Sequence, residues 1–283
     1  MDPISGAWVV LHRVGPDSAG PIDSVRSDAH GRYAFNYRRT GSADAVYFVS
    51  ASHDGIAYFT SPLAEGNVSG NDGEVIVFDT TSRHVPMTVR GHHVVVSAVD
   101  ANGMRSIVEV YDLSNDSSVT RIAAPGNPSD ATWRTHITPA ATNFRVSQGD
   151  IPPSAVSFAK GVVNVYAAIA PGIKQLSFSY SLPAKSFPLQ LPVETDTQIY
   201  EVMIEDKAGS VRAPNLREVD PVTVDERNFR RFLASDVPHN SLAVVDLPAP
   251  ASTRTIDPRY LVAITLVIGG TMVVALARAL GRR

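Results

Sequence analysis

Cysteine is absent from the 283 residues of this chain, and tryptophan occurs only twice. The absence of cysteine excludes disulfides, thiolate metal sites and a cysteine nucleophile. Long helix-forming stretches with an apolar repeat of 3.6 residues are also missing before residue 259. Val, Ser, Thr, Pro and Gly recur there instead, which predicts an all-β fold class. The length allows two or three domains.

An excess of positive charge is missing as well. The formal net charge is −3 at pH 7, with 25 Lys and Arg residues against 28 Asp and Glu residues. From Arg259 onward there are four arginines and no acid, so the preceding part holds 21 basic against 28 acidic groups, a charge of −7. Such an acidic body would be repelled by a phosphate backbone. We therefore expect no nucleic acid partner.

The motifs of common hydrolases and nucleotide-binding enzymes are absent, including G-x-S-x-G, H-E-x-x-H and a Walker-type Gly-Lys-Ser/Thr. The neighbouring His92 and His93 would point to opposite faces of a strand, and with His84 they do not suit one metal ion. We expect a protein that is not an enzyme, with no catalytic, cofactor-binding or metal-binding residues. A Ser-His-Asp triad assembled by folding remains the enzymatic alternative. The other histidines stand singly, mostly beside turns: His12, His30, His53, His136 and His239.

Two further groups allow two interpretations each. Four aspartates in expected turns could bind calcium, but without an EF-hand pattern they favour turn capping. They are Asp72, Asp100, Asp112 and Asp116. Three aromatic residues would form either an exposed contact patch or, as strand alternation more often dictates, part of a core. They are Tyr58, Phe59 and Trp133.

The strongest hydrophobic feature is an uncharged run of 18 residues from Tyr260 to Ala277. A helix needs ~20 residues to cross ~30 Å of hydrocarbon. We predict a linker at 249–258, a single transmembrane helix at 259–280 and a tail at 281–283. A buried core helix is the alternative, but the run has no polar face and arginines flank it.

The flanking charges predict the orientation of this helix. The end of the chain carries three arginines after the run, whereas Arg254 and Arg259 precede it. The positive-inside rule then places the C-terminus in the cytoplasm and the body in the periplasm or outside the cell. The opening MDPISGAWVV lacks the basic and apolar regions of an export signal. The orientation therefore requires a removed or missing signal, and a tail-anchored protein with a cytoplasmic body is the alternative.

Small residues in the predicted helix suggest a contact within the membrane. Thr265 and Gly269 form a small-xxx-small pair, and Gly270 lies beside it. Such residues let a neighbouring helix approach closely. We expect either an integral membrane partner at this face or glycines of the ordinary membrane-helix kind.

The N-terminal region predicts a series of strands at 7–14, 22–27, 45–52 and 56–61. Between them, in SDAHGRYAF, Asp28 and Gly31 would make a tight turn, and Tyr33 and Phe35 would alternate onto one face. This segment resembles the T-D-x-x-G-x-F/Y-x-F signature of carboxypeptidase regulatory-like domains. The resemblance implies a transthyretin-like β-sandwich at 1–82, closed by a strand at Glu74–Asp79. In that family the signature builds a turn and a core, and it implies a binding or spacer module.

The region 83–248 predicts a larger antiparallel β-sandwich, of one domain or two. Turn-forming residues separate strand-sized segments at intervals near ten residues. The one short helix expected there spans Asp225 to Ala234, with Arg227, Arg230 and Arg231 in solvent. The expected strands are 93–99, 106–113, 132–138, 142–146, 162–168, 173–182, 187–191, 198–206 and 241–247.

These features together favour a non-enzymatic accessory or scaffold subunit of an integral membrane complex. Its β-rich body would make protein–protein contacts, and its helix would lie in the lipid bilayer beside other integral membrane subunits. The arrangement resembles an auxiliary subunit of a bacterial membrane complex, of which a photosynthetic reaction-centre and antenna assembly is one example. The alternatives are a membrane-anchored receptor or adhesin that binds a ligand or carbohydrate, and an envelope hydrolase.

Overall fold

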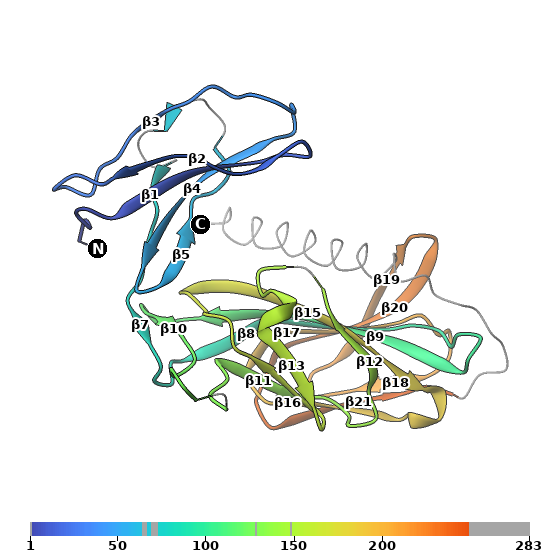
Figure 1. Cartoon of the computed structure of the whole chain (residues 1–283). Coiled ribbons are helices and arrows are strands. Elements are labelled where there is room, and N and C mark those ends of the chain that lie inside the picture. Colours follow the sequence, from blue (N-terminus) through green and yellow to red (C-terminus); the bar gives the residue numbers. More distant parts are fainter. Residues whose placement is uncertain (1, 64–66, 69–72, 128, 148, 249–283) are drawn as a thin grey trace. The chain divides into compact units, whose positions relative to one another are not determined.

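The computed structural model describes residues 2–63, 67–68, 73–127, 129–147 and 149–248, which form an all-β protein (Figure 1). These residues divide into two units, one of residues up to Thr81 with Ser118–Thr120 and one of Ser82–Ser117 with the chain from Arg121 onward. The described residues include no helix that is long and apolar enough to cross a membrane. The predicted linker, transmembrane helix and tail lie outside them, as do Thr265, Gly269 and Gly270.

Unit 1 is built on a four-stranded sheet in the order β2-β1-β4-β5. The strands run antiparallel to their neighbours. Alternate residues of β1 and β4, such as Leu11 and Val49, are fully buried and pack with Phe35 in the core of this unit. The strands of unit 1 are β1 (Trp8–Val14), β2 (Ala19–Arg26), β3 (Phe35–Asn36), β4 (Val46–His53), β5 (Ile56–Phe59), β6 (Asn67–Val68) and β7 (Thr80–Thr81).

The strand predicted at Glu74–Asp79 is wrong. The segment runs outside any sheet, and only β7 after it pairs, with β10 (Thr120–Arg121). Side-chain and loop contacts hold the segment instead. The Tyr58 hydroxyl donates to the carbonyl of Phe78 over 2.8 Å, and the Thr120 amide donates to the carbonyl of Asp79 over 2.8 Å. The alternating apolar pattern of Glu74–Asp79 therefore predicted a strand, but the segment has no strand to pair with among the described residues.

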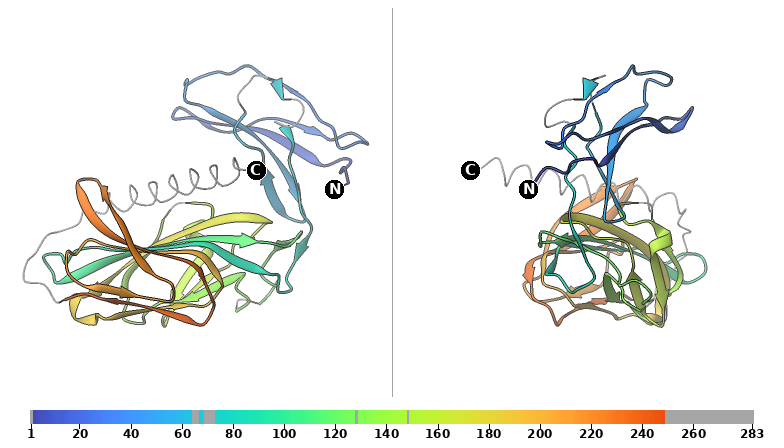
Figure 2. Two further views of the ribbon diagram at one scale, coloured as in Figure 1. Left: turned by 180° about the vertical axis from the view of Figure 1, so that it is seen from behind. Right: turned by 60° about the vertical axis from the view of Figure 1, so that its left-hand side comes forward.

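Unit 2 contains one seven-stranded sheet in the order β12-β15-β9-β8-β17-β20-β19 and two three-stranded sheets, β11-β14-β13 and β16-β21-β18. Figures 1 and 2 show the long sheet and the short sheets as two layers. The strands are β8 (Met87–Val96), β9 (Met104–Asn115), β11 (Trp133–His136), β12 (Thr142–Val146), β13 (Val156–Ala159), β14 (Val162–Val165), β15 (Gly172–Pro183), β16 (Leu189–Val193), β17 (Thr197–Ile204), β18 (Ser210–Arg212), β19 (Arg217–Val224), β20 (Arg227–Val237) and β21 (Ser241–Asp246).

One continuous core lies between these layers. It joins residues of the long sheet, such as Phe178 and Val202, to residues of both short sheets, such as Val163 and Val245. Because a single core spans the three sheets, unit 2 is one β-sandwich in which the apolar faces of the sheets cover each other.

One pairing in the long sheet departs from the predicted antiparallel order. β17 pairs in parallel with β8, with Tyr200 opposite His92 and Ile204 opposite Val96. Parallel neighbours need a long crossover, and here the chain passes through β9 to β16 between them. Local turn signals carry no information about such a distant pairing.

The helix predicted at Asp225–Ala234 is also wrong, because these residues form a turn and most of strand β20. Asp225 and Glu226 have positive φ angles of 46° and 61°, and they join β19 to β20. The three arginines are paired rather than free in solvent. Arg227 binds Glu205, Arg230 binds Glu218 and Arg231 binds Glu201.

Candidate functional site

The face of the unit 1 sheet opposite its core carries a row of aromatic side chains. Trp8 and His12 lie on β1, Phe48 on β4 and Phe59 on β5, and alternation places them opposite the buried set. The His12 and Phe48 rings stack with centroids 5.1 Å apart, and Phe59 meets Phe48 edge-on at 5.8 Å. We call these four residues, together with Val14 and Val46, the aromatic face.

Much of the aromatic face is exposed. Trp8 is 53% exposed and Phe59 is 59% exposed, and Val14 and Val46 are exposed beside them. The Arg26 guanidinium lies over the Trp8 ring at 4.4 Å, so one edge of the face carries a positive charge. Contiguous exposed apolar side chains on one sheet face mark a surface that suits a binding partner.

The signature residues Asp28 and Gly31 lie in one tight turn. The Asp28 carboxylate accepts hydrogen bonds from the amides of His30 and Arg32, both at 2.8 Å, and the Gly31 amide donates to the Asp28 carbonyl. The Arg32 and His30 amides hold the pKa of Asp28 below its ordinary value. Gly31 has a φ of +71°, which a side chain disfavours.

The other two signature residues lie in and beside the core. Phe35 is buried, and Tyr33 meets its ring edge-on at 5.7 Å. The Tyr33 hydroxyl donates to the carbonyl of Gly73, and burial raises the pKa of Tyr33 to about 12. These contacts give Tyr33 and Phe35 a structural role in the core of unit 1.

A pocket of about 280 Å³ opens next to this turn. Its walls come from the N-terminal segment, the turn and Tyr33, the end of β4 and the segment that follows Gly73. Mixed polar and apolar walls of this size suit a small ligand rather than a protein surface. The lining includes Ile4, His30, Tyr33, His53, Glu74 and Ile76.

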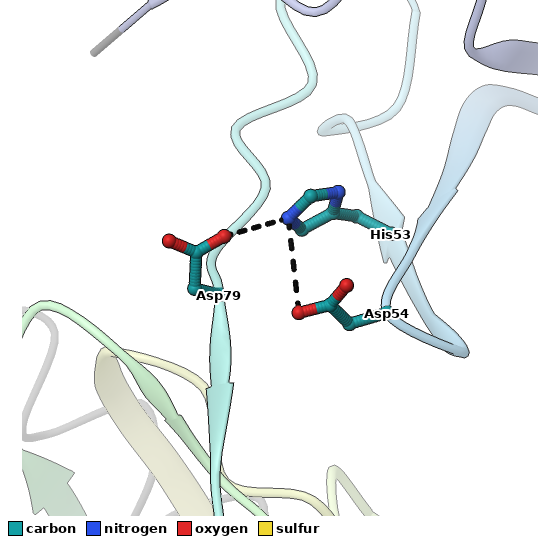
Figure 3. A group of neighbouring side chains, drawn as sticks. All are labelled: His53, Asp54 and Asp79. Carbon is teal, nitrogen blue, oxygen red and sulfur yellow. Dashed lines mark hydrogen bonds and ion pairs between the residues drawn. The ribbon is translucent and has the colours of Figure 1, made fainter.

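His53, Asp54 and Asp79 form the one group of metal-ligand type found among the described residues (Figure 3). His53 and Asp54 stand at the tip of the β4–β5 hairpin, and Asp79 comes just before β7. The sequence predicted no metal-binding residues, and it gave His53 only as one of the single histidines that mostly stand beside turns. Asp79 is distant along the chain, so no local pattern links it to the hairpin.

In unit 2 a buried carboxylate, Glu109, is enclosed by aromatic groups. Glu109 is 1% exposed, and its oxygens accept from the Tyr111 hydroxyl at 2.9 Å and the Tyr180 hydroxyl at 2.7 Å. The His92 Nε2 lies 2.9 Å from the same carboxylate, and its ring stacks on Tyr111 at 3.9 Å. Burial lowers the pKa of His92 and raises that of both tyrosines. The enclosed position favours a structural role.

His93 lies on the opposite face of β8, as the alternation of a strand predicts. Its Nδ1 is 2.8 Å from Glu201, which also accepts from Arg231 Nε at 2.7 Å. Burial raises the pKa of Glu201, but His93 and Arg231 together outweigh that effect and lower it. Because the two neighbouring histidines serve different carboxylates, they do not form one site.

The aspartates considered for calcium have other roles. Asp112 lies within β9 rather than in a turn, and burial raises its pKa. Asp100 caps a turn by accepting from the amides of Asn102 and Met104, while Asp116 accepts from Thr88, Arg90 and Ser114. Asp72 lies outside the described residues.

Of the three aromatic residues with two interpretations, Tyr58 and Trp133 are buried and Phe59 is exposed. Phe59 alone of the three therefore belongs to a surface patch.

Neither the family models nor the curated proteins contain a match to this chain. The candidate sites of unit 1 and unit 2 accordingly rest on their geometry.

Proposed function

We propose that this chain is a non-enzymatic accessory or scaffold subunit of an integral membrane complex, and that the aromatic face of unit 1 binds a partner protein. The observation that carries this proposal is the exposure of Trp8 and Phe59 on a regular sheet, next to Phe48 and His12. Aromatic side chains are enriched in the centres of protein interfaces.

The aromatic face has properties that favour a protein partner over a small molecule. Its residues come from three paired strands, so their backbone positions are fixed before binding. The hydrogen bond of 2.8 Å between His12 and Ser50 also orients one ring. Because Trp8 and Phe59 are already about half buried, covering the rest of each side chain would contribute about 1–1.5 kcal/mol before the costs of association.

The membrane part of the proposal rests on the apolar run from Tyr260 to Ala277. A helix there would hold the β-rich body at the surface of a bilayer, on the periplasmic or extracellular side. The partners would then be integral membrane subunits, and Thr265, Gly269 and Gly270 would pack against one of their helices. From the resemblance of the SDAHGRYAF segment to the carboxypeptidase regulatory-like signature, we also propose a transthyretin-like sandwich for unit 1.

A second candidate is a membrane-anchored receptor or adhesin, which the pocket beside Tyr33 favours. Its walls combine the signature turn with His53 and Glu74, so a small polar ligand or a sugar could be held by both polar and apolar groups. In this case the pocket, rather than the aromatic face, would carry the function.

Gentle detergent extraction of native membranes, followed by size separation and mass spectrometry, tests the proposal. The unchanged chain should co-migrate in fixed stoichiometry with integral membrane proteins. A chain with Trp8→Ser and Phe59→Ser should lose that co-migration, because the variant removes exposed apolar area and leaves the core of the sheet unchanged.

Leu242→Ser supplies the matched control, since Leu242 is an exposed apolar residue on β21 of unit 2. It should leave co-migration intact. Migration of the unchanged chain alone would contradict the subunit proposal and favour the receptor. Co-migration that survives both substitutions in the aromatic face would show that the partner binds elsewhere.

A further inference from the structure

Three ligand atoms converge at the tip of the β4–β5 hairpin. His53 Nε2 lies 2.9 Å from Asp79 Oδ1 and 4.0 Å from Asp54 Oδ2, and all three atoms are within 4.8 Å of one another. Figure 3 shows the imidazole with the same nitrogen directed toward both carboxylates. One nitrogen and two carboxylate oxygens thus lie close enough together to bind one metal ion.

The hairpin fixes two of the three ligands. His53 pairs with Ile56, which leaves Asp54 and Gly55 as the loop between β4 and β5. Their φ angles of +50° and +78° are both positive, as in the type I′ turn that suits the twist of a hairpin. The neighbouring side chains of His53 and Asp54 are therefore presented together at a tight, regular turn.

The third ligand is held by contacts on both sides of its backbone. Tyr58, on β5 of the same hairpin, donates to the Phe78 carbonyl at 2.8 Å, and its hydroxyl lies 2.7 Å from Thr120 Oγ1. The Thr120 amide in turn donates to the Asp79 carbonyl at 2.8 Å. These hydrogen bonds hold the backbone of Asp79 near the hairpin without a metal ion. A metal site requires such preorganised ligands.

We infer that His53, Asp54 and Asp79 bind a divalent transition-metal ion of the Zn²⁺ type. Imidazole nitrogen and carboxylate oxygen bind Zn²⁺ at about 2.0–2.2 Å, which places tetrahedral ligand atoms about 3.3 Å apart. The distances from His53 Nε2 to Asp79 Oδ1 and Asp54 Oδ2, 2.9 and 4.0 Å, lie on either side of that spacing, and the two carboxylate oxygens are within 4.8 Å of each other. Calcium is disfavoured, because it takes 6–8 oxygen ligands and this group offers a nitrogen.

The site leaves part of the coordination sphere open. Three protein ligands leave a fourth tetrahedral position for water, and the Asp79 and Asp54 side chains are 82% and 46% exposed. The Thr80 amide lies 3.3 Å from Asp54 Oδ2 and helps to orient that carboxylate. A hydrogen-bonded His–Asp pair without metal is the competing explanation, and it predicts no affinity for Zn²⁺.

Calorimetric titration of the untagged full-length chain with ZnCl₂ tests the inference. One Zn²⁺ should bind per chain, and His53→Gln and Asp79→Asn should each weaken binding at least about tenfold. CoCl₂ gives an independent readout, because tetrahedral Co²⁺ has visible absorption bands that the two variants should lose. Asp54→Asn should also weaken binding while keeping the turn, since Asn tolerates a positive φ.

His239→Gln is the matched control. His239 Nδ1 lies 2.7 Å from Asp196 in an exposed His–Asp pair on unit 2, but no third ligand joins it among the described residues. This variant should bind Zn²⁺ as the unchanged chain does. Lack of Zn²⁺ binding by the unchanged chain would overturn the inference, as would full affinity in both His53→Gln and Asp79→Asn or an equal loss in His239→Gln.

Discussion

Tyr180 and Tyr200 allow a direct comparison of two buried hydroxyl groups in one core. The Tyr180 hydroxyl donates to Glu109 at 2.7 Å, whereas the buried Tyr200 hydroxyl has no hydrogen-bond partner among the residues that the structure describes. Tyr180→Phe should therefore lower the free energy of unfolding of unit 2 by about 1–3 kcal/mol, because it leaves a buried carboxylate oxygen without a donor. Urea denaturation followed by circular dichroism measures this change.

Tyr200→Phe is the control for that substitution. It removes a hydroxyl group that makes no hydrogen bond to the described part of the chain, so the free energy of unfolding should stay the same or rise. An equal loss in the two variants would show that the Glu109 network contributes nothing specific to the stability of unit 2.

Gly31 tests the tight turn of unit 1. A Cβ at this position would lie 2.8 Å from Pro3 Cβ, and the φ of +71° already disfavours a side chain. Gly31→Ala should cost about 1–3 kcal/mol from backbone strain and the close contact together. Thermal unfolding of the variant gives the measurement.

The turn at Asp100 to Met104 supplies a matched control for Gly31. Gly103 has a φ of +73°, but a Cβ there would meet nothing within 4 Å. Gly103→Ala should therefore cost only the backbone part, about 1–2 kcal/mol. If Gly103→Ala destabilised its unit more than Gly31→Ala destabilises unit 1, the contact with Pro3 would not be a source of strain.

These two turns also show what the sequence could predict at the residue scale. Asp28-Ala-His-Gly31 and Asp100-Ala-Asn-Gly103 form the same hydrogen bonds, with the glycine amide donating to the aspartate carbonyl in each. Both were predictable as turns because their contacts are local. The repeat in unit 2 shows that the Asp-x-x-Gly part of the signature indicates a turn rather than a particular family.

At the scale of single elements, strand β20 shows where local pattern failed. Its charged start, from Asp225 to Arg231, suggested a solvated helix. In the strand each arginine instead reaches a glutamate, and the partners lie on different elements, such as Glu201 on β17 and Glu218 on β19. A sequence pattern does not identify such partners, because they are distant along the chain.

The pairing of Arg231 with the buried Glu201 predicts a pH-dependent contribution to stability. The folded pKa of Glu201 is lowered below its ordinary value, so the stabilisation is present at neutral pH and is lost as the pH falls through that folded pKa, below about 4.5. Arg231→Gln should cost about 1–3 kcal/mol at pH 7. The difference from the unchanged chain should shrink in acid.

Arg230→Gln is the control on the same strand. Its partner Glu218 is about half exposed, so the pair should contribute at most about 1 kcal/mol at pH 7. Urea denaturation at pH 7 and at pH 3 measures both variants. A cost for Arg231→Gln that is no greater than that of Arg230→Gln would contradict the argument from burial.

At the scale of the whole molecule, the sequence predicted the all-β class, but it did not predict which strands pair or which distant side chains meet. The all-β class followed from alternation and turn signals, and β12 begins and ends at the predicted residues. The parallel pairing of β8 with β17, the Glu109 network and the His53 cluster all join segments far apart in the chain. The local periodicity of a sequence does not predict contacts between distant segments.

The aromatic face also belongs to this scale, because its six residues come from three strands. In the sequence, Trp8, Val10, His12 and Val14 alternate with Val9 and Leu11, so β1 is apolar on both faces. That pattern could have indicated a second buried or binding surface. Only the pairing of β1 with β4, and of β4 with β5, shows that Phe48 and Phe59 extend it.

Photo-crosslinking from position 59 tests the central proposal most directly. A benzophenone amino acid in place of Phe59 keeps an aromatic side chain on the aromatic face, and the same amino acid at Leu242 serves as the control. Irradiation of native membranes should give a covalent product with an integral membrane protein from position 59 but not from position 242. The absence of a product from position 59, or the same product from both positions, would contradict the proposal that this face binds the partner.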